Sequence, residues 1–144
     1  MNAVPGWFLL ALLSAVFAAL TAIFAKIGLE GVDADYATLI RTLVIVTLLT
    51  IYVTSAGKWV NPATLSKKSL LFLVLSGLAT GASWFCYFRA LKLGDAAKVA
   101  PIDKLSLALV AIFATLFLGE KLGGKDWTGI ALIVSGIILL GLKK

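Results

Sequence analysis

Five apolar runs occupy almost the whole of this 144-residue sequence, and they constrain its fold more than any other feature. Each is close to the ~20 residues that a helix needs to cross the ~30 Å hydrocarbon core of a bilayer. The runs cover about residues 5–29, 36–54, 70–91, 96–118 and 127–142. We therefore expect five transmembrane helices and very little mass outside the membrane.

The composition supports an all-α fold. Hydrophobic residues make up 61% of the chain and charged residues 14%, too few for a soluble domain of this size to cover its surface. Backbone groups in lipid must be paired internally, which leaves helices or closed barrels. Barrel strands alternate between apolar and polar residues, whereas these runs are continuous. The predicted fold class is an all-α polytopic membrane protein, with residues 1–144 forming a single domain.

The sequence lacks the residues that several functional classes of protein require. The sequence has no histidine, one cysteine (Cys86) and no Gly-rich phosphate loop, so we expect no enzymatic activity, metal or cofactor. Transport, if it occurs, would be passive or driven by an ion or solute gradient. The net charge of +6 comes with lysines at helix ends, which favours contact with anionic lipid headgroups over nucleic acid.

The distribution of basic residues predicts no preferred orientation. Orientation follows the Lys/Arg bias of short loops. Lysines in the connections on the N-terminal side of the membrane are Lys58, Lys67, Lys68, Lys121 and Lys125, and those on the opposite side are Lys92, Lys98, Lys143 and Lys144. A chain with so small a bias can insert both ways, and two opposed copies can then pair.

Charged residues also interrupt the apolar runs, all in the same half of the bundle: Lys26, Arg41, Arg89, Asp103 and Lys104. Each such charge costs about 2.5–3.5 kcal/mol on insertion scales, and less where a long side chain reaches the interface. Such a cluster favours a polar, water-accessible vestibule. For Lys26 and Arg89 a second interpretation stays open, namely that they extend to the headgroups.

Asp103 is the carboxylate placed deepest in a run, and its short side chain needs a partner or a proton. The next residue, Lys104, is rotated by about 100° around a helix, so we expect the partner to be Arg41 or Lys26. Asp103 is either a coupling-ion site or part of a structural ion pair. Pro101 interrupts the helix nearby and is a candidate hinge, and Ser106 would share the face of Asp103.

An aromatic cluster lies in the third run. Trp84 and Tyr87 are three residues apart and share a helix face, and Phe88 is four residues from Trp84. An indole ring can stack on a flat or cationic solute. The cluster is therefore either ordinary packing or one wall of a binding site.

The connections carry helix-end signals. Asp33 or Asp35 is expected to cap the second helix, and Ser66, Asp95 and Asp126 the following three. Gly94 lies where the end of the third helix would need a left-handed residue. It predicts a very tight turn between the third and fourth helices, which must then be antiparallel neighbours.

Several segments resemble the EamA domain of the drug/metabolite transporter superfamily: ALKLGDAAKVAP at 90–101, LFLGEK at 116–121, WTG at 127–129 and GIILL at 136–140. The length of the chain resembles the short, five-helix bacterial and archaeal group. The sequence departs from this superfamily at Leu107, where EamA repeats carry a proline. Related small multidrug exporters place a glutamate in the first helix, and residues 9–25 contain no acid.

The resemblance implies secondary transport, often export, of metabolites or drugs. It also implies that a lone repeat pairs with an oppositely oriented copy. We therefore expect an antiparallel homodimer in the inner membrane of a bacterium or archaeon, moving a small organic solute, acidic or zwitterionic, by alternating access. The expected substrate contacts, near the bilayer centre between the first, third and fourth helices, are Trp84, Tyr87, Asp103, Ser106, Arg41, Lys104 and Lys26. The alternatives are a non-transporting scaffold or regulatory subunit and a component of a lipid-linked sugar flippase.

Overall fold

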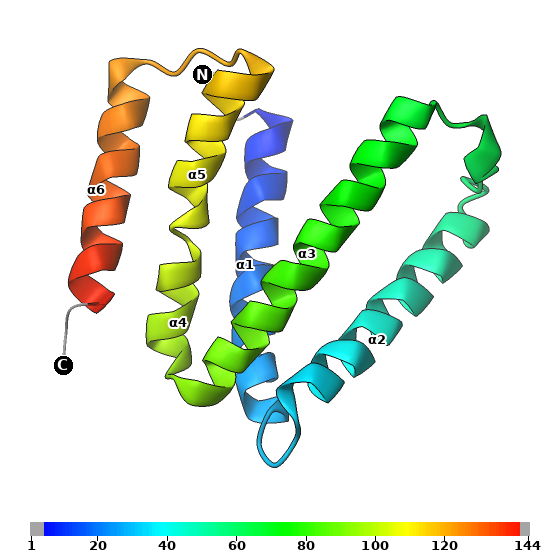
Figure 1. Cartoon of the computed structure of the whole chain (residues 1–144), viewed down its shortest axis with the longest axis horizontal. Coiled ribbons are helices and arrows are strands. Elements are labelled where there is room, and N and C mark those ends of the chain that lie inside the picture. Colours follow the sequence, from blue (N-terminus) through cyan, green and yellow to red (C-terminus); the bar gives the residue numbers. More distant parts are fainter. Residues whose placement is uncertain (1–4, 142–144) are drawn as a thin grey trace. The chain divides into compact units, whose positions relative to one another are not determined.

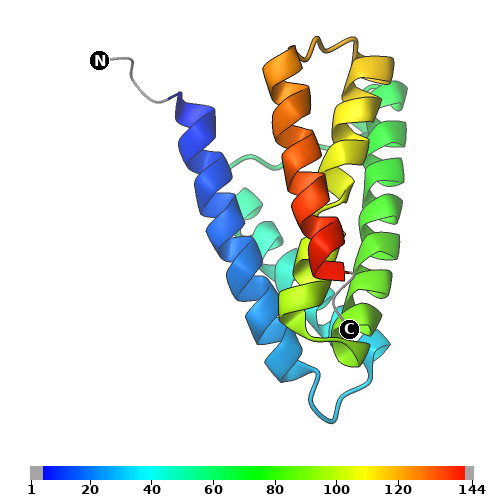
Figure 2. The ribbon, with the colours of Figure 1, turned by 90° about the vertical axis from the view of Figure 1, so that its left-hand side faces the viewer.

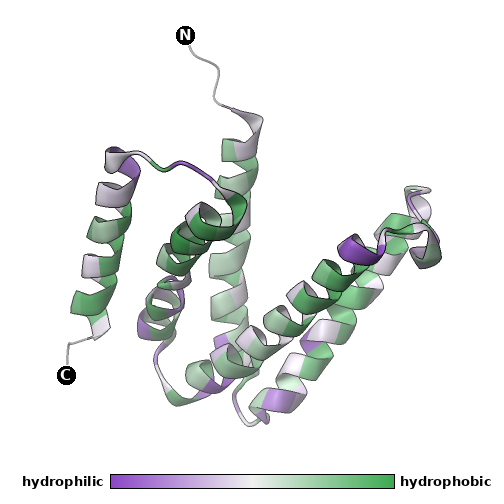
Figure 3. Cartoon of the chain, turned by 45° about the horizontal axis from the view of Figure 1, so that its top comes forward, coloured by the Kyte–Doolittle hydropathy of each residue, from purple (hydrophilic) through white to green (hydrophobic). Residues whose placement is uncertain are grey.

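The computed structural model describes residues 5–141, and within this range the chain is helical with no strand. Five helical segments are long and apolar enough to cross a membrane: Gly6–Gly28, Ala34–Ser55, Lys67–Leu93, Ala96–Leu118 and Gly124–Gly141. Hydrophobic residues cover most of each helix, and strongly hydrophilic residues concentrate near helix ends and connections (Figure 3). The all-α fold class and the five spans are confirmed.

The chain forms two compact units, one up to Leu93 and one from Gly94 onward. The N-terminal unit contains α1 (Gly6–Gly28), α2 (Ala34–Ser55), the short 3₁₀ helix η1 (Pro62–Thr64) and α3 (Lys67–Leu93). Within this unit α2 and α3 run antiparallel and pack side by side, and α3 also contacts α1 (Figure 1). That the whole chain acts as one domain stays a prediction.

The connection between α1 and α2 is short and held by local hydrogen bonds. Gly31 has φ +70°, a left-handed conformation that glycine adopts without strain. Asp33, rather than Asp35, caps α2: its Oδ1 accepts from the N–H groups of Asp35 and Tyr36 at 2.9 and 3.2 Å. Donation from these backbone groups, Tyr36 first, holds the pKa of the Asp33 carboxyl below its ordinary value.

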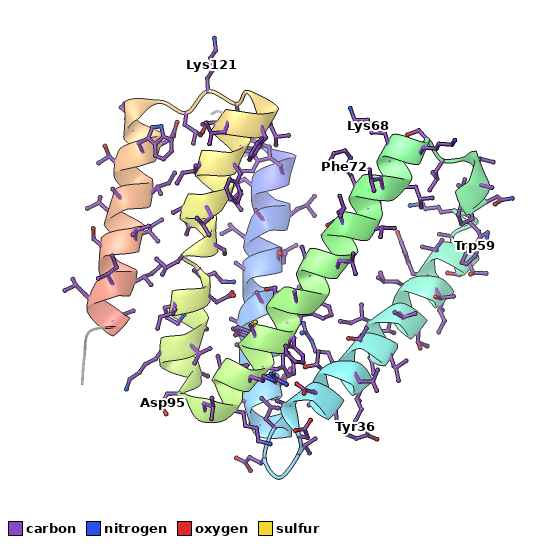
Figure 4. The ribbon with its side chains drawn as sticks, in the orientation of Figure 1. Tyr36, Trp59, Lys68, Phe72, Asp95 and Lys121 are labelled. Atoms are coloured by element: carbon purple, nitrogen blue, oxygen red, sulfur yellow. The ribbon has the colours of Figure 1, made fainter. Side chains whose placement is uncertain are left out.

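The connection between α2 and α3 also follows its sequence signals. Asn61 caps η1 by accepting from the N–H of Ala63 at 3.0 Å, and Ser66 accepts from Ser69 N–H at 3.0 Å at the start of α3, which confirms Ser66 as a cap. Trp59 and Lys68 lie at this end of the α2–α3 pair, and Tyr36 lies at the other (Figure 4).

The C-terminal unit contains α4 (Ala96–Asp103), α5 (Ser106–Phe113), the π-helical segment η2 (Ala114–Leu118) and α6 (Gly124–Gly141). Within it α6 packs antiparallel to α4 and α5 (Figure 2). Gly119 ends η2 in the left-handed conformation, φ +69°. Asp95 is the N-cap residue of α4, without a capping hydrogen bond from its side chain, and lies at one end of the unit; Lys121 extends from the connection at the other (Figure 4).

The fourth membrane span is interrupted between α4 and α5, three residues beyond Pro101. Lys104 donates to the carbonyl of Pro101 and Leu105 to that of Ile102, both at 3.0 Å, so hydrogen bonds here join residues three apart instead of four. Proline has already removed one donor from this helix. The tightened turn places Asp103 and Ser106 on different helices, and their spacing of three residues therefore no longer guarantees a shared face.

Two expectations about helix ends were wrong. Among the described residues a positive φ occurs at Gly31, Gly57 and Gly119 but not at Gly94. The turn before α4 is made instead by Asp95 in an extended conformation, with ψ 135°. Asp126 does not precede the last helix, because α6 begins at Gly124; its Oδ2 reaches back and accepts from Gly123 N–H at 2.8 Å.

Candidate functional site

A cavity of about 400 Å³ lies in the N-terminal unit between its three helices. Its walls are mostly apolar, and Arg41 is its one charged residue. The lining residues are Thr21, Phe24, Ala25 and Gly28 from α1, Val32 from the following loop, Ala37, Ile40 and Arg41 from α2, and Phe88 from α3. Such a space is at the small end of the ~300–1,000 Å³ of small-molecule sites.

Arg41 is held by aromatic rings. Its guanidinium carbon lies 4.3 Å from the ring centroid of Trp84 and 5.3 Å from that of Phe88, both within the range of a cation–π contact. Arg41 and Trp84 are partly buried, and Phe88 is buried. The contact arises because Trp84 and Phe88 are four residues apart on α3 and therefore share a face.

Three contacts tie the end of α3 to α1, to the α1–α2 connection and to the first turn of α2. Arg89 pairs with Asp35 in a fork, Nε to Oδ1 at 3.0 Å and Nη2 to Oδ2 at 2.8 Å, and its guanidinium carbon lies 3.7 Å from the Phe85 ring centroid. We use the name closing contacts for this ion pair together with two hydrogen bonds, one donated by Lys92 and one donated by Lys26. Lys92 Nζ donates to the carbonyl of Val32 at 2.7 Å.

The third closing contact is a hydrogen bond from Lys26 Nζ to the carbonyl of Leu91 at 2.7 Å. Leu91 is fully buried, and Val32, the acceptor for Lys92, is also a wall of the cavity. The basic residues at this end of the N-terminal unit therefore link chain segments beside the cavity. For Arg89 the structure favours an ion pair over extension to the headgroups.

Three of the predicted site residues, Asp103, Lys104 and Ser106, belong to the C-terminal unit and are described within it. Asp103 Oδ2 lies 3.2 Å from Lys104 Nζ, contrary to the expectation that Lys104 would turn away. Lys104 follows the last residue of α4 with ψ −4°, so the helical rotation does not fix its direction. Ser106 opens α5 and is exposed. An additional partner for Asp103 in Arg41 or Lys26 stays a prediction.

The structure thus brings some of the predicted site residues together. Arg41 lines the cavity against Trp84. Lys26 donates to Leu91 beside it, and Tyr87 lies on α3 next to Phe88, with ring centroids 6.3 Å apart. The face of Trp84 expected to stack on a solute carries Arg41, and stacking of a solute on this ring or on Tyr87 stays a prediction.

Several residues that line the cavity were not predicted from the sequence. Thr21, Phe24 and Ile40 are ordinary residues of apolar helices and carry no signal of their own. Asp35 was detectable, because an acid at the start of α2 and a base at the end of α3 lie at the same membrane surface. The sequence pattern predicted only a capping role for Asp35.

Comparisons with known proteins agree with one another. The profile of the EamA-like transporter family matches residues 5–142. The chain is 57% identical over 136 residues to a protein of Sinorhizobium sp. named "uncharacterized transporter in cobO 3′ region", and the match covers 94% of this chain and 96% of that protein. An uncharacterized protein of Methanocaldococcus jannaschii is 30% identical, with the same two coverages.

A riboflavin transporter of Rhizobium johnstonii is 29% identical over 136 residues. This match covers 94% of the present chain but 44% of that protein, which is therefore about twice as long. No solved structure matches the chain.

Proposed function

Since the chain belongs to the EamA-like transporter family, and is a multi-pass membrane transporter with five spans, we propose that it moves a small organic solute whose binding site is the cavity of the N-terminal unit. The observation that carries this proposal is Arg41: a partly buried cation on the wall of an otherwise apolar cavity within a membrane span. Such residues are costly in lipid, and by default they mark solute or ion pathways.

We propose further that two copies work together in opposite orientations as a homodimer. The nearly equal Lys/Arg counts of the two sides support dual insertion. The lengths of the relatives support it too, since the Rhizobium riboflavin transporter is about twice as long as this chain. Two opposed copies would resemble the inverted repeats around which many transporters alternate access by rocking.

In this proposal the two groups of polar residues have different roles. Arg41, Trp84, Tyr87 and Lys26 belong to the N-terminal unit and act on the solute or close its cavity. Asp103, Lys104 and Ser106 lie at the break between α4 and α5, where Pro101 has weakened the helix and a hinge is expected. Asp103 is the candidate for a coupling ion, and export across the inner membrane of a bacterium or archaeon is the expected direction.

Reconstitution tests transport. The purified protein in liposomes should take up a labelled solute down an imposed gradient, and riboflavin is the first solute to try because one relative is named for it. Arg41→Ala should abolish uptake while the protein still purifies as a folded dimer. A protein that neither moves nor binds any member of a broad metabolite panel would contradict the proposal and favour a non-transporting scaffold.

Labelling from both faces tests the pairing. Cys86 is the one cysteine of the chain, so Cys86→Ser with Lys58→Cys gives a single reporter on the connection between α2 and α3. An impermeant maleimide should label it in part from outside the cell and in part in inverted vesicles. Labelling from one side alone would contradict dual insertion.

A further inference from the structure

The guanidinium of Arg41 has hydrogen-bonding capacity that its own unit leaves unused. Its contacts there are with the ring faces of Trp84 and Phe88, which engage the charge but accept no N–H···O bond. Within residues 5–93 no carbonyl or carboxylate accepts a hydrogen bond from Arg41. Arginine presents its donors in a planar fork that matches a carboxylate with two parallel bonds.

The acidic residues of the N-terminal unit make contacts elsewhere or are exposed to solvent. Asp35 is engaged by Arg89, Asp33 caps α2, and Glu30 is exposed on the connection after α1. The other basic residue close to the cavity, Lys26, donates to the Leu91 carbonyl. Arg41 is the one charged residue that lines the cavity, and no carboxylate among residues 5–93 pairs with it, which matches a solute with a single negative charge.

The other residues that line the cavity indicate the shape and polarity of the rest of the solute. Phe24 and Phe88 supply aromatic rings and Ile40 an aliphatic side chain, while Thr21 is the other residue with a polar side chain. Aromatic walls favour a flat ring by offset or edge contacts. A volume of about 400 Å³ suits a molecule of a few fused rings and is too small for a two-chain phospholipid.

Building on the proposed function, which places the solute in this cavity, we propose that the protein selects flat aromatic or heterocyclic monocarboxylates. The carboxylate lies against the Arg41 fork and the ring between the apolar helices. Trp84 and Phe88 are positioning residues, because they hold the guanidinium in place for the carboxylate. Neutral analogues of the same shape bind less well, because they leave the fork without an anion.

The test is a binding measurement on the full-length protein in nanodiscs of phosphatidylcholine. The probes are 2-naphthoate, neutral 2-naphthamide and cationic 2-naphthylmethylammonium, which share one ring system. Because a hydrogen bond between two charged groups is stronger than one to a neutral amide, naphthoate should bind at least about tenfold more tightly than the amide, and the cation should bind least. Arg41→Gln should make naphthoate and naphthamide equal.

Two variants serve as controls. Lys68→Gln removes an exposed cation at the opposite end of α3 and should leave the naphthoate preference unchanged. Arg41→Lys keeps the charge without the fork and should retain a reduced preference. It keeps the test valid if Arg41→Gln does not fold.

The outcomes separate this inference from the proposed function. Equal affinities of the wild type for naphthoate and naphthamide would overturn the inference, even if another solute were transported. Displacement of naphthoate by added phosphatidylglycerol would also overturn it, because the anion site would then belong to lipid. Selective naphthoate binding without any transport in liposomes would support the inference and contradict the proposed function.

Discussion

The contact between Arg41 and Trp84 should be measurable as a coupling energy. Cation–π contacts are worth about 0.5–1 kcal/mol at exposed sites and about 2 kcal/mol when desolvated. Arg41 and Trp84 are partly buried and their separation is 4.3 Å, so we expect a coupling of about 1–2 kcal/mol. The variants are Arg41→Gln, Trp84→Leu and the double variant. The measured quantity is the free energy of unfolding in mixed micelles containing increasing fractions of SDS.

A double-mutant cycle isolates this term, because the separate costs of losing the charge and the ring cancel. Phe88 supplies a matched comparison: it is 5.3 Å from the guanidinium carbon and has the weaker ring, so Arg41 and Phe88→Leu should couple less strongly. Additive effects of Arg41→Gln and Trp84→Leu would refute the reasoning. A larger coupling for Phe88 than for Trp84 would also refute it.

Three further predictions concern the cavity and its surroundings. Gly28 lines the cavity and a Cβ there would meet nothing within 4 Å, so Gly28→Leu should cut solute uptake without lowering stability, whereas Gly6→Leu, equally uncrowded, should leave uptake unchanged. Normal uptake by Gly28→Leu would argue against the cavity as the site. Asp35→Asn should impair uptake by releasing a closing contact, and the exchanged pair Asp35→Arg with Arg89→Asp should restore part of it; no recovery would show that the pair is not what matters. Because backbone N–H donors lower the pKa of Asp33 in the folded protein, its carboxylate stabilises the fold above its ordinary pKa, and this is lost as pH falls through the folded value. Acid should therefore destabilise the wild type more than Asp33→Asn, in which the side-chain oxygen still caps α2 but does not titrate; equal acid sensitivity would contradict this.

The spans could be predicted because lipid imposes a simple rule on sequence. Every backbone group must be paired within its own helix, so a continuous apolar run of the right length is enough evidence for a helix. The caps at Asp33 and Ser66 follow from side chains that hydrogen-bond only to nearby residues. Gly94 was predicted with the wrong conformation: it has no positive φ, and the residue after it, Asp95, is extended before α4 begins.

The site was harder to predict because its geometry depends on contacts between helices. Arg41 stood out because a charge in an apolar run is costly, and Trp84 because its indole is large and polar at one edge. Their mutual contact could not be predicted, because helical periodicity fixes faces within a helix but not which faces meet. For Asp103 and Ser106 the error lay within the helix itself. A shared face was predicted from regular helical periodicity, but the hydrogen bonds after Pro101 join residues three apart and interrupt that periodicity.

Protection of a cysteine in the cavity tests the central claim most directly. In a Cys86→Ser background, Gly28→Cys places one thiol on the cavity wall, and Gly6→Cys places one at the far end of α1. A solute that the protein transports should slow maleimide labelling of Cys at position 28 in proportion to its occupancy and leave position 6 unaffected. Labelling at position 28 that stays equally fast at saturating transported solute would show that the solute binds elsewhere.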